Sequence, residues 1–154
     1  MKHFIDAGLS LLPEKMNTSE ARAMLIAIGL QESKFEHRKQ IQGPALGFWQ
    51  FERAGILGVL AHSASKFYLI EACGVLKIEP FNEIFEAVRW NDALACILAR
   101  LLLWTFPDPL PDEGEVNKSW NQYLKTWRPG KPHRETWDNF FNRGWELTLQ
   151  ERIN

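Results

Sequence analysis

The chain has 154 residues, enough for one domain that buries about two thirds of the surface its unfolded form would expose. Its 18 Lys and Arg against 19 Asp and Glu give a formal charge of −1, so no broad basic surface for nucleic acid or an anionic bilayer is expected. The 45% of hydrophobic and 24% of charged residues are typical of a soluble globular protein. We therefore expect one domain, residues 1–154, without a nucleic-acid partner.

The cysteines, the histidines and the N-terminus give no sign of a metal centre or an export signal. Cys73 and Cys96 lie in apolar surroundings and resemble small buried hydrophobes, while the 4 His show no ligand spacing, so neither a metal nor another cofactor is expected. The N-terminus has no long apolar run of the kind that a signal peptide needs. The apolar run at residues 93–103 is interrupted by Arg100 and is too short to span a bilayer, so it predicts a buried helix without stable membrane insertion.

Helical periodicity, capping residues and proline positions predict a mainly α-helical domain, and no segment shows convincing strand alternation. Asn17 is the expected cap of the second helix, with Glu20 in a variant of the capping box. Ser63 or Ser65 is expected to cap a helix that reaches about Leu76. The second helix is predicted to span residues 18–35. The remaining predicted helices are residues 3–12, 52–61, 82–88 and 90–104 (two helices or one bent helix), 116–127 and 135–149.

Two polar stretches between these helices are predicted loops. Residues 39–47 are marked by Gly and Pro and would carry the chain across the mouth of a cleft. Residues 107–114 contain three prolines and form the longest clear loop, a candidate border of a substrate groove.

One acidic residue occupies an apolar position of the second predicted helix. Ala21, Leu25 and Ile28 form one stripe, and Glu32 continues it at a step of four residues. A carboxylate on a buried helix face loses hydration, which raises its pKa towards neutrality. A general acid for a sugar leaving group needs this property. The alternative is that Glu32 lies at a fraying helix end and points into water.

The residues around this acid resemble the signatures of a known enzyme family. Glu32-Ser33-x-Phe35, followed by Ala45-x-Gly47-x-x-Gln50, is similar to the Glu-Ser-x-Phe and Ala-x-Gly-x-x-Gln signatures of soluble lytic transglycosylases and goose-type lysozymes. The resemblance is most specific over residues 25–52. It implies a lysozyme-like fold with a substrate cleft, in which residues 38–50 could supply a small β-hairpin.

Two further segments resemble the family more loosely. The run that begins at Asn91 is like its Asn-opened, Ala-rich helix, and Trp127-Arg128-Pro129-Gly130 falls where it usually shows Tyr-Asn-Ala-Gly. This last segment, together with Gly43 to Glu52, looks like a bacteriophage branch of the superfamily. A virion-associated or endolysin-type enzyme of cell-wall degradation is therefore implied.

The activity that the resemblance implies is cleavage of the β-1,4 bond between N-acetylmuramic acid and N-acetylglucosamine, with Glu32 as general acid and base. Glu32 can act alone if the hydroxymethyl group of the muramyl sugar attacks C1, which gives a 1,6-anhydro product. Plain hydrolysis needs a second carboxylate about 5 to 10 Å away. Glu52 is the best-placed candidate, with Glu36 and Asp92 as weaker ones. The alternative for Glu52 is a solvated carboxylate that the helix dipole favours.

Several residues are expected to bind the saccharide. Gln50 can present both an acceptor and a donor to an N-acetyl group, or can bond to the backbone of its own turn. Arg128 has planar donors for a lactyl or peptide carboxylate, or can cap a helix carbonyl. Trp127 and Arg128 replace the Tyr and Asn of the transglycosylases, which keeps plain hydrolysis open. The full set of candidate binding residues is Ser33, Gly47, Phe48, Gln50, Asn91, Tyr123, Trp127 and Arg128.

Peptidoglycan glycan strands are therefore the expected partner, together with a virion or a secretion machinery. The protein would be made in the cytoplasm and act at the bacterial cell wall. Two alternatives stay open: a chitinase-like hydrolase, and a murein-binding or virion-structural module that has the fold without turnover.

Overall fold

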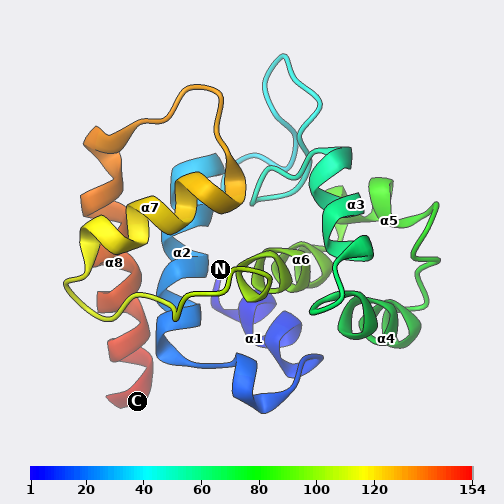
Figure 1. Ribbon diagram of the computed structural model, residues 1–154, viewed down its shortest axis with the longest axis horizontal. Helices are drawn as coiled ribbons and strands as arrows, with labels where there is room; N and C mark the ends of the chain where they lie inside the picture. The colour runs from blue at the N-terminus through cyan, green and yellow to red at the C-terminus, as the bar shows by residue number, and fades with distance from the viewer. Residues whose placement is uncertain (154) are drawn as a thin grey trace.

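The computed structural model describes residues 1–153 and is mainly α-helical, as expected. Within this range it has eight α-helices, one 3₁₀ turn and no named strand (Figure 1). The helices are α1 (Lys2–Ser10), α2 (Ser19–Ser33), α3 (Arg53–Ala61), α4 (Lys66–Leu76), α5 (Ile84–Trp90), α6 (Asp92–Trp104), α7 (Val116–Trp127) and α8 (Arg134–Ile153), with the 3₁₀ turn η1 at Glu14–Met16.

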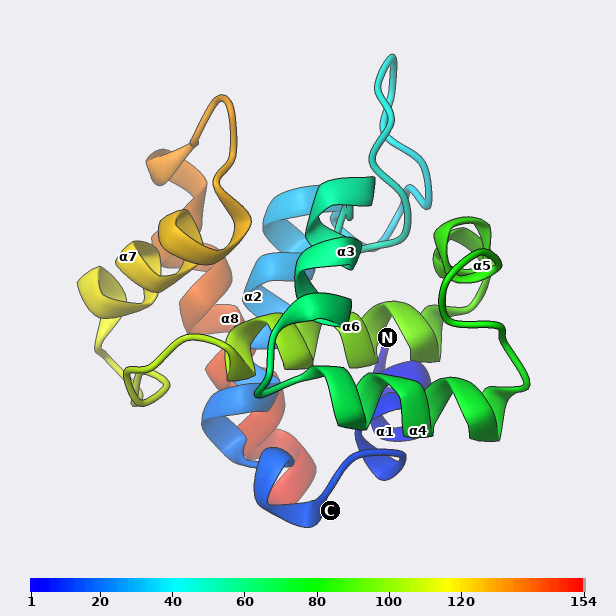
Figure 2. The ribbon, with the colours of Figure 1, turned by 45° about the vertical axis from the view of Figure 1, so that its right-hand side comes forward.

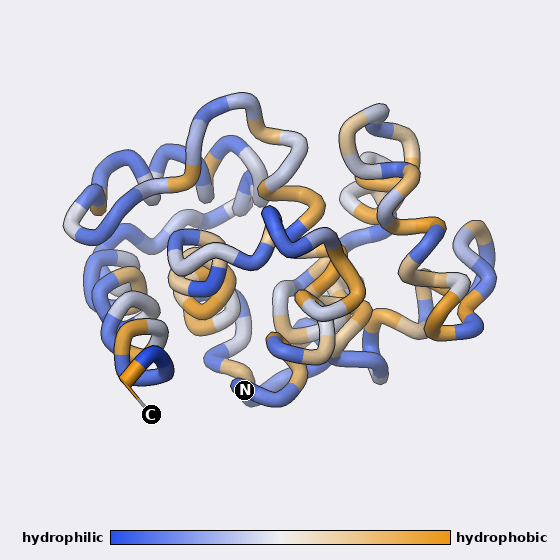
Figure 3. Tube along the Cα trace, turned by 90° about the horizontal axis from the view of Figure 1, so that it is seen from below, coloured by the Kyte–Doolittle hydropathy of each residue, from blue (hydrophilic) through white to orange (hydrophobic). Residues whose placement is uncertain are grey.

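Helix α6 forms the centre of the core, as its apolar run predicted. Residues 94–99 of this helix are all fully buried, and α1, α2, α3, α4 and α5 pack against it. Helices α2 and α8 form the most extensive helix pair and lie side by side in both ribbon views (Figures 1 and 2). Coloured by hydropathy, the chain is hydrophilic along much of its outer loops (Figure 3). The fold is thus one connected helical core.

A buried arginine interrupts this core without disrupting it. Arg100 is 3% exposed, and its Nε donates to the carbonyl of Met16 at 2.7 Å. Its guanidinium also lies over the ring of Trp104. Burial lowers the pKa of Arg100 to about 10, so it stays charged at neutral pH. The predicted small buried hydrophobes, Cys73 and Cys96, are both buried and free.

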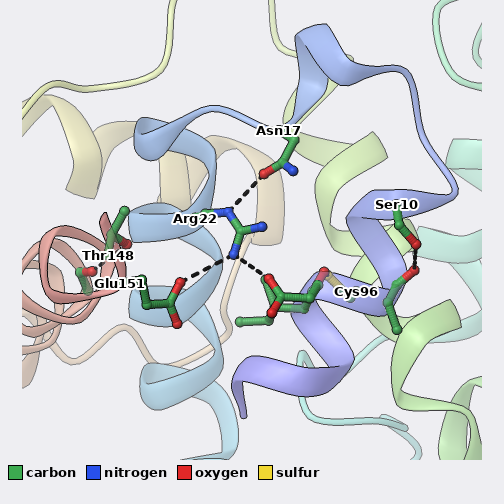
Figure 4. A network of polar contacts seen from close by, with 10 residues as sticks. Ser10, Asn17, Arg22, Cys96, Thr148 and Glu151 are labelled. Carbon is green, nitrogen blue, oxygen red and sulfur yellow. Dashed lines mark hydrogen bonds and ion pairs between the residues drawn. The ribbon is translucent and has the colours of Figure 1, made fainter. Parts of the chain in front are cut away.

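The N-terminal end of α2 carries a polar network that joins three helices (Figure 4). Arg22 Nη1 pairs with Asp6 of α1 at 2.6 Å and with Glu151 of α8 at 3.3 Å. Its Nε donates to Asn17 at 2.8 Å. This network occupies Asn17, and Thr18 caps α2 instead by accepting from the amide of Ala21 at 3.2 Å. The predicted Asn17 cap is therefore wrong by one residue.

Other boundaries differ from the prediction for local reasons. Helix α2 ends at Ser33 and not at Phe35, because Lys34 and Phe35 adopt left-handed backbone angles with φ of 53° and 55°. Ser65 occupies the N-cap position of α4, but its hydroxyl donates to the carbonyl of Val59 and makes no cap bond. Asn91 separates α5 from α6, so the predicted pair is two helices.

The segment predicted to form a small β-hairpin contains isolated bridges only. Leu46 pairs with both Lys39 and Phe51, in antiparallel fashion. Residues 38–51 are therefore a loop pinned at its base. Its exposed first part, in cyan, rises clear of the helices (Figure 2), while Phe48, Trp49 and Phe51 are buried.

Candidate active site

An open groove of about 1450 Å³ lies at the C-terminal end of α2. Two of its walls are loops that rise on the same side of the molecule, residues 37–45 in cyan and residues 128–133 in orange (Figures 1 and 2). Side chains of α3, α6 and α7 complete the lining. The loop at residues 107–114, a predicted border, is not part of the lining, although the preceding Phe106 is.

Glu32 lines this groove from the last turn of α2. The three apolar residues of its stripe, Ala21, Leu25 and Ile28, are fully buried, and Glu32 is half-buried where the stripe meets the groove. Burial raises the pKa of Glu32 to about 7, while a hydrogen bond from Tyr123 opposes the rise. A large fraction of this carboxyl is therefore protonated near neutrality, which suits a general acid. The alternative of a carboxylate pointing freely into water is wrong.

Tyr123 of α7 fixes the orientation of this carboxyl. Its hydroxyl donates to Glu32 Oε1 at 2.5 Å, and its ring stacks on Trp137 of α8 with centroids 4.7 Å apart. Burial, with the charge of Glu32, raises the pKa of Tyr123, so the phenol stays protonated and remains a donor. Since Oε1 accepts this bond, the proton of the neutral acid belongs on Oε2.

Ser33 and Phe48 fasten the turn at residues 47–50 to α2. Ser33 Oγ donates to the carbonyl of Phe48 at 2.7 Å and accepts from the amide of Phe35 at 3.1 Å. Both residues are buried, at 6% and 4% exposure, and neither lines the groove. Their predicted role in substrate binding is corrected to a structural one, because the hydroxyl and the ring are used inside the fold.

Phe35 and Trp49 complete this attachment. Phe35 folds back over Gly29, where a Cβ atom would lie 2.1 Å from the tip of its ring, so only glycine leaves room for it. The indole of Trp49 donates to the carbonyl of Leu25 at 2.8 Å. Ser33 and Phe35 of the Glu-Ser-x-Phe motif thus hold the turn, which carries the groove-lining Gln50, against α2.

Gly47 and Gln50 have different roles in that turn. Gly47 has φ of 75°, and a Cβ atom there would lie 2.9 Å from the carbonyl of Val88. Gly47 does not line the groove, so its role is conformational. Gln50 does line it, and its Nε2 donates to the carbonyl of Gly47 at 2.9 Å. The predicted bond within the turn is therefore present, and the side chain also borders the groove.

Asn91 and Asp92 are committed to the start of α6. Asn91 Oδ1 caps the helix by accepting from the amide of Leu94 at 3.0 Å. Asp92 accepts two hydrogen bonds from Arg38, each of 2.9 Å. Neither residue lines the groove. The predicted binding role of Asn91 and the weaker catalytic candidacy of Asp92 are therefore corrected to structural roles.

Of the other carboxylates that were candidates, only Glu52 lines the groove. Glu52 is exposed, directly precedes α3 and makes no side-chain cap bond to that helix. This position is compatible with both predicted roles, a second carboxylate and a charge at a helix N-terminus. Glu36 is exposed beside His37 and does not line the groove, so it is excluded from the site.

Trp127 and Arg128 lie at the end of α7, where the groove has its far wall. Trp127 Nε1 donates to the carbonyl of Trp49 at 2.9 Å, which joins α7 to the turn of the opposite wall. Arg128 adopts a left-handed φ of 49°, and its Nε donates to the carbonyl of Lys125 at 3.4 Å. The predicted helix-carbonyl contact of Arg128 is present, and Arg128 also lines the groove.

The sequence did not single out five basic or titratable residues that line the groove. They lie in loops or on a helix, where no periodic pattern distinguishes them from other surface residues. Only their closeness in sequence to the two motif segments could have indicated that they line the groove. They are His37, Lys39, Lys125, Lys131 and His133.

No three side chains of His, Cys, Asp or Glu within residues 1–153 gather closely enough to hold a metal ion. Nor does any helix there combine the length and apolar character needed to cross a bilayer. Comparison of the chain with protein-family models, curated proteins and solved structures finds no match in any of the three.

Proposed function

We propose that this protein is a peptidoglycan-cleaving glycosidase with a lysozyme-like fold, and that Glu32 is its general acid. One observation carries the proposal: a half-buried carboxyl with a pKa of about 7 lines a large open groove and accepts a 2.5 Å hydrogen bond from a tyrosine that stays neutral. A glycosidase needs a carboxylic acid that holds its proton near neutral pH and faces the substrate.

The chemistry follows from the two oxygens of Glu32. Oε1 accepts from Tyr123, which leaves Oε2 to carry the transferable proton. Protonation of the glycosidic oxygen by Oε2 lets the bond from that oxygen to C1 break, and the resulting Glu32 carboxylate keeps the hydrogen bond from Tyr123. The same carboxylate then serves as the base that deprotonates the group attacking C1.

The size of the groove supports an oligomeric substrate. Pockets for single small molecules are typically about 300 to 1,000 Å³, and this groove is larger, at about 1450 Å³. Gln50, Tyr123, Trp127 and Arg128 are the predicted binding residues that line it. The resemblance of residues 25–52 to lytic transglycosylases and goose-type lysozymes favours a murein strand, which places the site of action at the bacterial cell wall.

Two routes remain available to this acid, and they give different products. Attack by the hydroxymethyl group of the muramyl sugar uses Glu32 alone and produces a 1,6-anhydro end. Attack by water produces a reducing end, and Glu52 is then the carboxylate in the groove that can assist it.

Digestion of purified murein followed by mass spectrometry tests the proposal. Wild-type protein should release muropeptides from the sugar backbone, and a mass lower by one water identifies the anhydro route. Glu32→Gln should release almost none, while Glu71→Gln, which changes an exposed carboxyl on α4 outside the groove, should match wild type. Chitin oligomers form a second arm, since cleavage of chitin in preference to murein would indicate a chitinase-like hydrolase. Absence of release from both polymers by folded wild-type protein would refute catalysis.

A further inference from the structure

The groove has a positive lining in a molecule whose formal charge is −1. Four cationic side chains line it, against the two carboxyls of Glu32 and Glu52. About half of Glu32 is neutral at pH 7, because its pKa is about 7. The four cations are Lys39, Lys125, Arg128 and Lys131.

None of these four cations pairs with a carboxylate within residues 1–153. Elsewhere in the described chain, Arg22, Arg38 and Arg134 each contact an acid within 3 Å, while single exposed cations such as Lys66 and Lys77 pair with none. What distinguishes the four is that they gather in one groove. Unpaired cations that share one groove repel each other, and an anion bound among them relieves this repulsion. Their placement therefore indicates an anionic ligand.

Helix geometry explains only part of this arrangement. Lys125 and Arg128 lie at the C-terminal end of α7, where the helix dipole favours cations. Lys39 and Lys131 have no such reason, since they stand on two separate loops that line the groove. A ligand that extends from one loop to the other would meet positive charge on both.

We infer that the groove recognises the carboxylates that project from a murein strand, those of the stem peptides and of unsubstituted lactyl groups. This inference rests on the proposed function and names the feature of the substrate that the protein selects. Every muramyl sugar carries such an acidic arm, whereas chitin is neutral. Arg128 offers paired planar donors to a carboxylate, and the three lysines offer point charges that tolerate variation in where the peptide lies.

Binding measured without turnover tests this inference. The background is Glu32→Gln, and the probes are soluble murein glycan fragments with intact stem peptides, the same fragments with their carboxyls blocked as methylamides, and chitohexaose. We expect the free-carboxylate fragments to bind roughly 3- to 30-fold more tightly than the blocked ones, since two or more partly screened pairs would form. This preference should shrink as salt is added.

Matched double variants assign the effect to the groove. Lys39→Gln with Lys131→Gln should remove most of the preference for free carboxylates and leave binding of the blocked fragments unchanged. Lys66→Gln with Lys77→Gln removes the same charge from exposed positions on and next to α4, outside the groove, and should keep the preference.

Three results would overturn the inference. Equal binding of free and blocked fragments by the Glu32→Gln protein would do so, as would a preference that survives loss of Lys39 and Lys131. Tighter binding of a short DNA duplex, lost in that same double variant, would assign the groove to nucleic acid instead. If murein cleavage depends on Glu32 but blocking the carboxylates changes nothing, only this inference fails; if free carboxylates are preferred but no murein is cleaved, only the catalytic proposal fails.

Discussion

The two ends of helix α2 each carry an ionisable side chain, and the two side chains differ in the partners that surround them. At the N-terminal end, Arg22 is satisfied by Asp6, Glu151 and Asn17 from three different segments. At the other end, about 15 Å along the helix axis, Glu32 has a neutral partner, Tyr123, and no cation within residues 1–153 pairs with it. Arg22 therefore links α1, α2 and α8. Burial of Glu32 without a cation instead disfavours its ionised form, so the carboxyl keeps its proton to higher pH.

This difference teaches how one helix can serve both structure and chemistry. A partly buried charge with several partners stabilises the fold at modest net gain. A partly buried charge without an opposite charge shifts its pKa instead. Four predictions test whether the two ends differ in this way, and they run from the largest expected effect to the smallest.

The largest effect is expected from Glu32→Gln on activity. The amide keeps the shape of the side chain and still accepts from Tyr123, but it has no acidic proton for the leaving oxygen. Release of soluble fragments from murein should fall by roughly 10²- to 10⁴-fold, as is typical when acid catalysis is lost. A variant with near-wild-type lytic rate would make Glu32 structural and would move the search for an acid to Glu52.

The same substitution should stabilise the fold in a pH-dependent way. The native pKa of Glu32, about 7, lies above the ordinary value of 4.5, so the native state binds the extra proton between these pH values and wild-type stability falls as pH rises through them. Glu32→Gln should gain nothing below pH 4.5 and, above pH 7, on the order of 3 kcal/mol in free energy of unfolding. Denaturant unfolding at pH 4 and pH 8 measures this, and an equal gain at both would contradict the shift.

Arg22→Gln should act in the opposite sense. It breaks the contacts with Asp6 and Glu151, so the free energy of unfolding should fall by about 1 to 2 kcal/mol, because these partners are partly exposed. The activity of the folded fraction should be unchanged, since Arg22 does not line the groove. A loss of activity without a loss of stability would show that the two ends of α2 are not independent. Lys66→Gln, an exposed change outside this network, is the control.

The smallest effect is expected from Tyr123→Phe on the pH profile. The Tyr123 hydrogen bond lowers the pKa of Glu32 against the larger effect of burial. Removing the hydroxyl should therefore raise that pKa and move the alkaline limb of the activity profile above its wild-type position near pH 7. A limb that moves to lower pH would mean that Tyr123 does not stabilise the charged form of Glu32.

Local sequence patterns predicted most of the helices and the partly buried position of Glu32. The stripe of Ala21, Leu25 and Ile28 predicted the buried face of α2, and its continuation predicted a carboxyl with a raised pKa. Such patterns are visible in the sequence because helical periodicity is a property of neighbouring residues. Caps were less certain, as at Thr18, since adjacent polar residues compete for the same position.

The tertiary structure decided which motif residues face the groove. Ser33 and Phe48 share the motif segments with Glu32 and Gln50, and Asn91 opens the segment of looser resemblance, yet their polar groups and rings are used inside the fold. Tyr123 was expected to bind the saccharide, but it also donates to Glu32, and this bond spans 91 positions of the chain. No local pattern encodes such a bond.

The amino-acid sequence by itself thus determined the helices, the buried core and the acidic residue placed on an apolar face, because these depend on local spacing and hydrophobicity. Only the tertiary structure decided that Tyr123 meets Glu32, that the turn is fastened through Ser33, and that unpaired cations from two loops share one groove. The reason is physical: the pKa of a carboxyl and the field in a groove depend on every group within a few ångströms, and those groups come from segments that are remote along the chain.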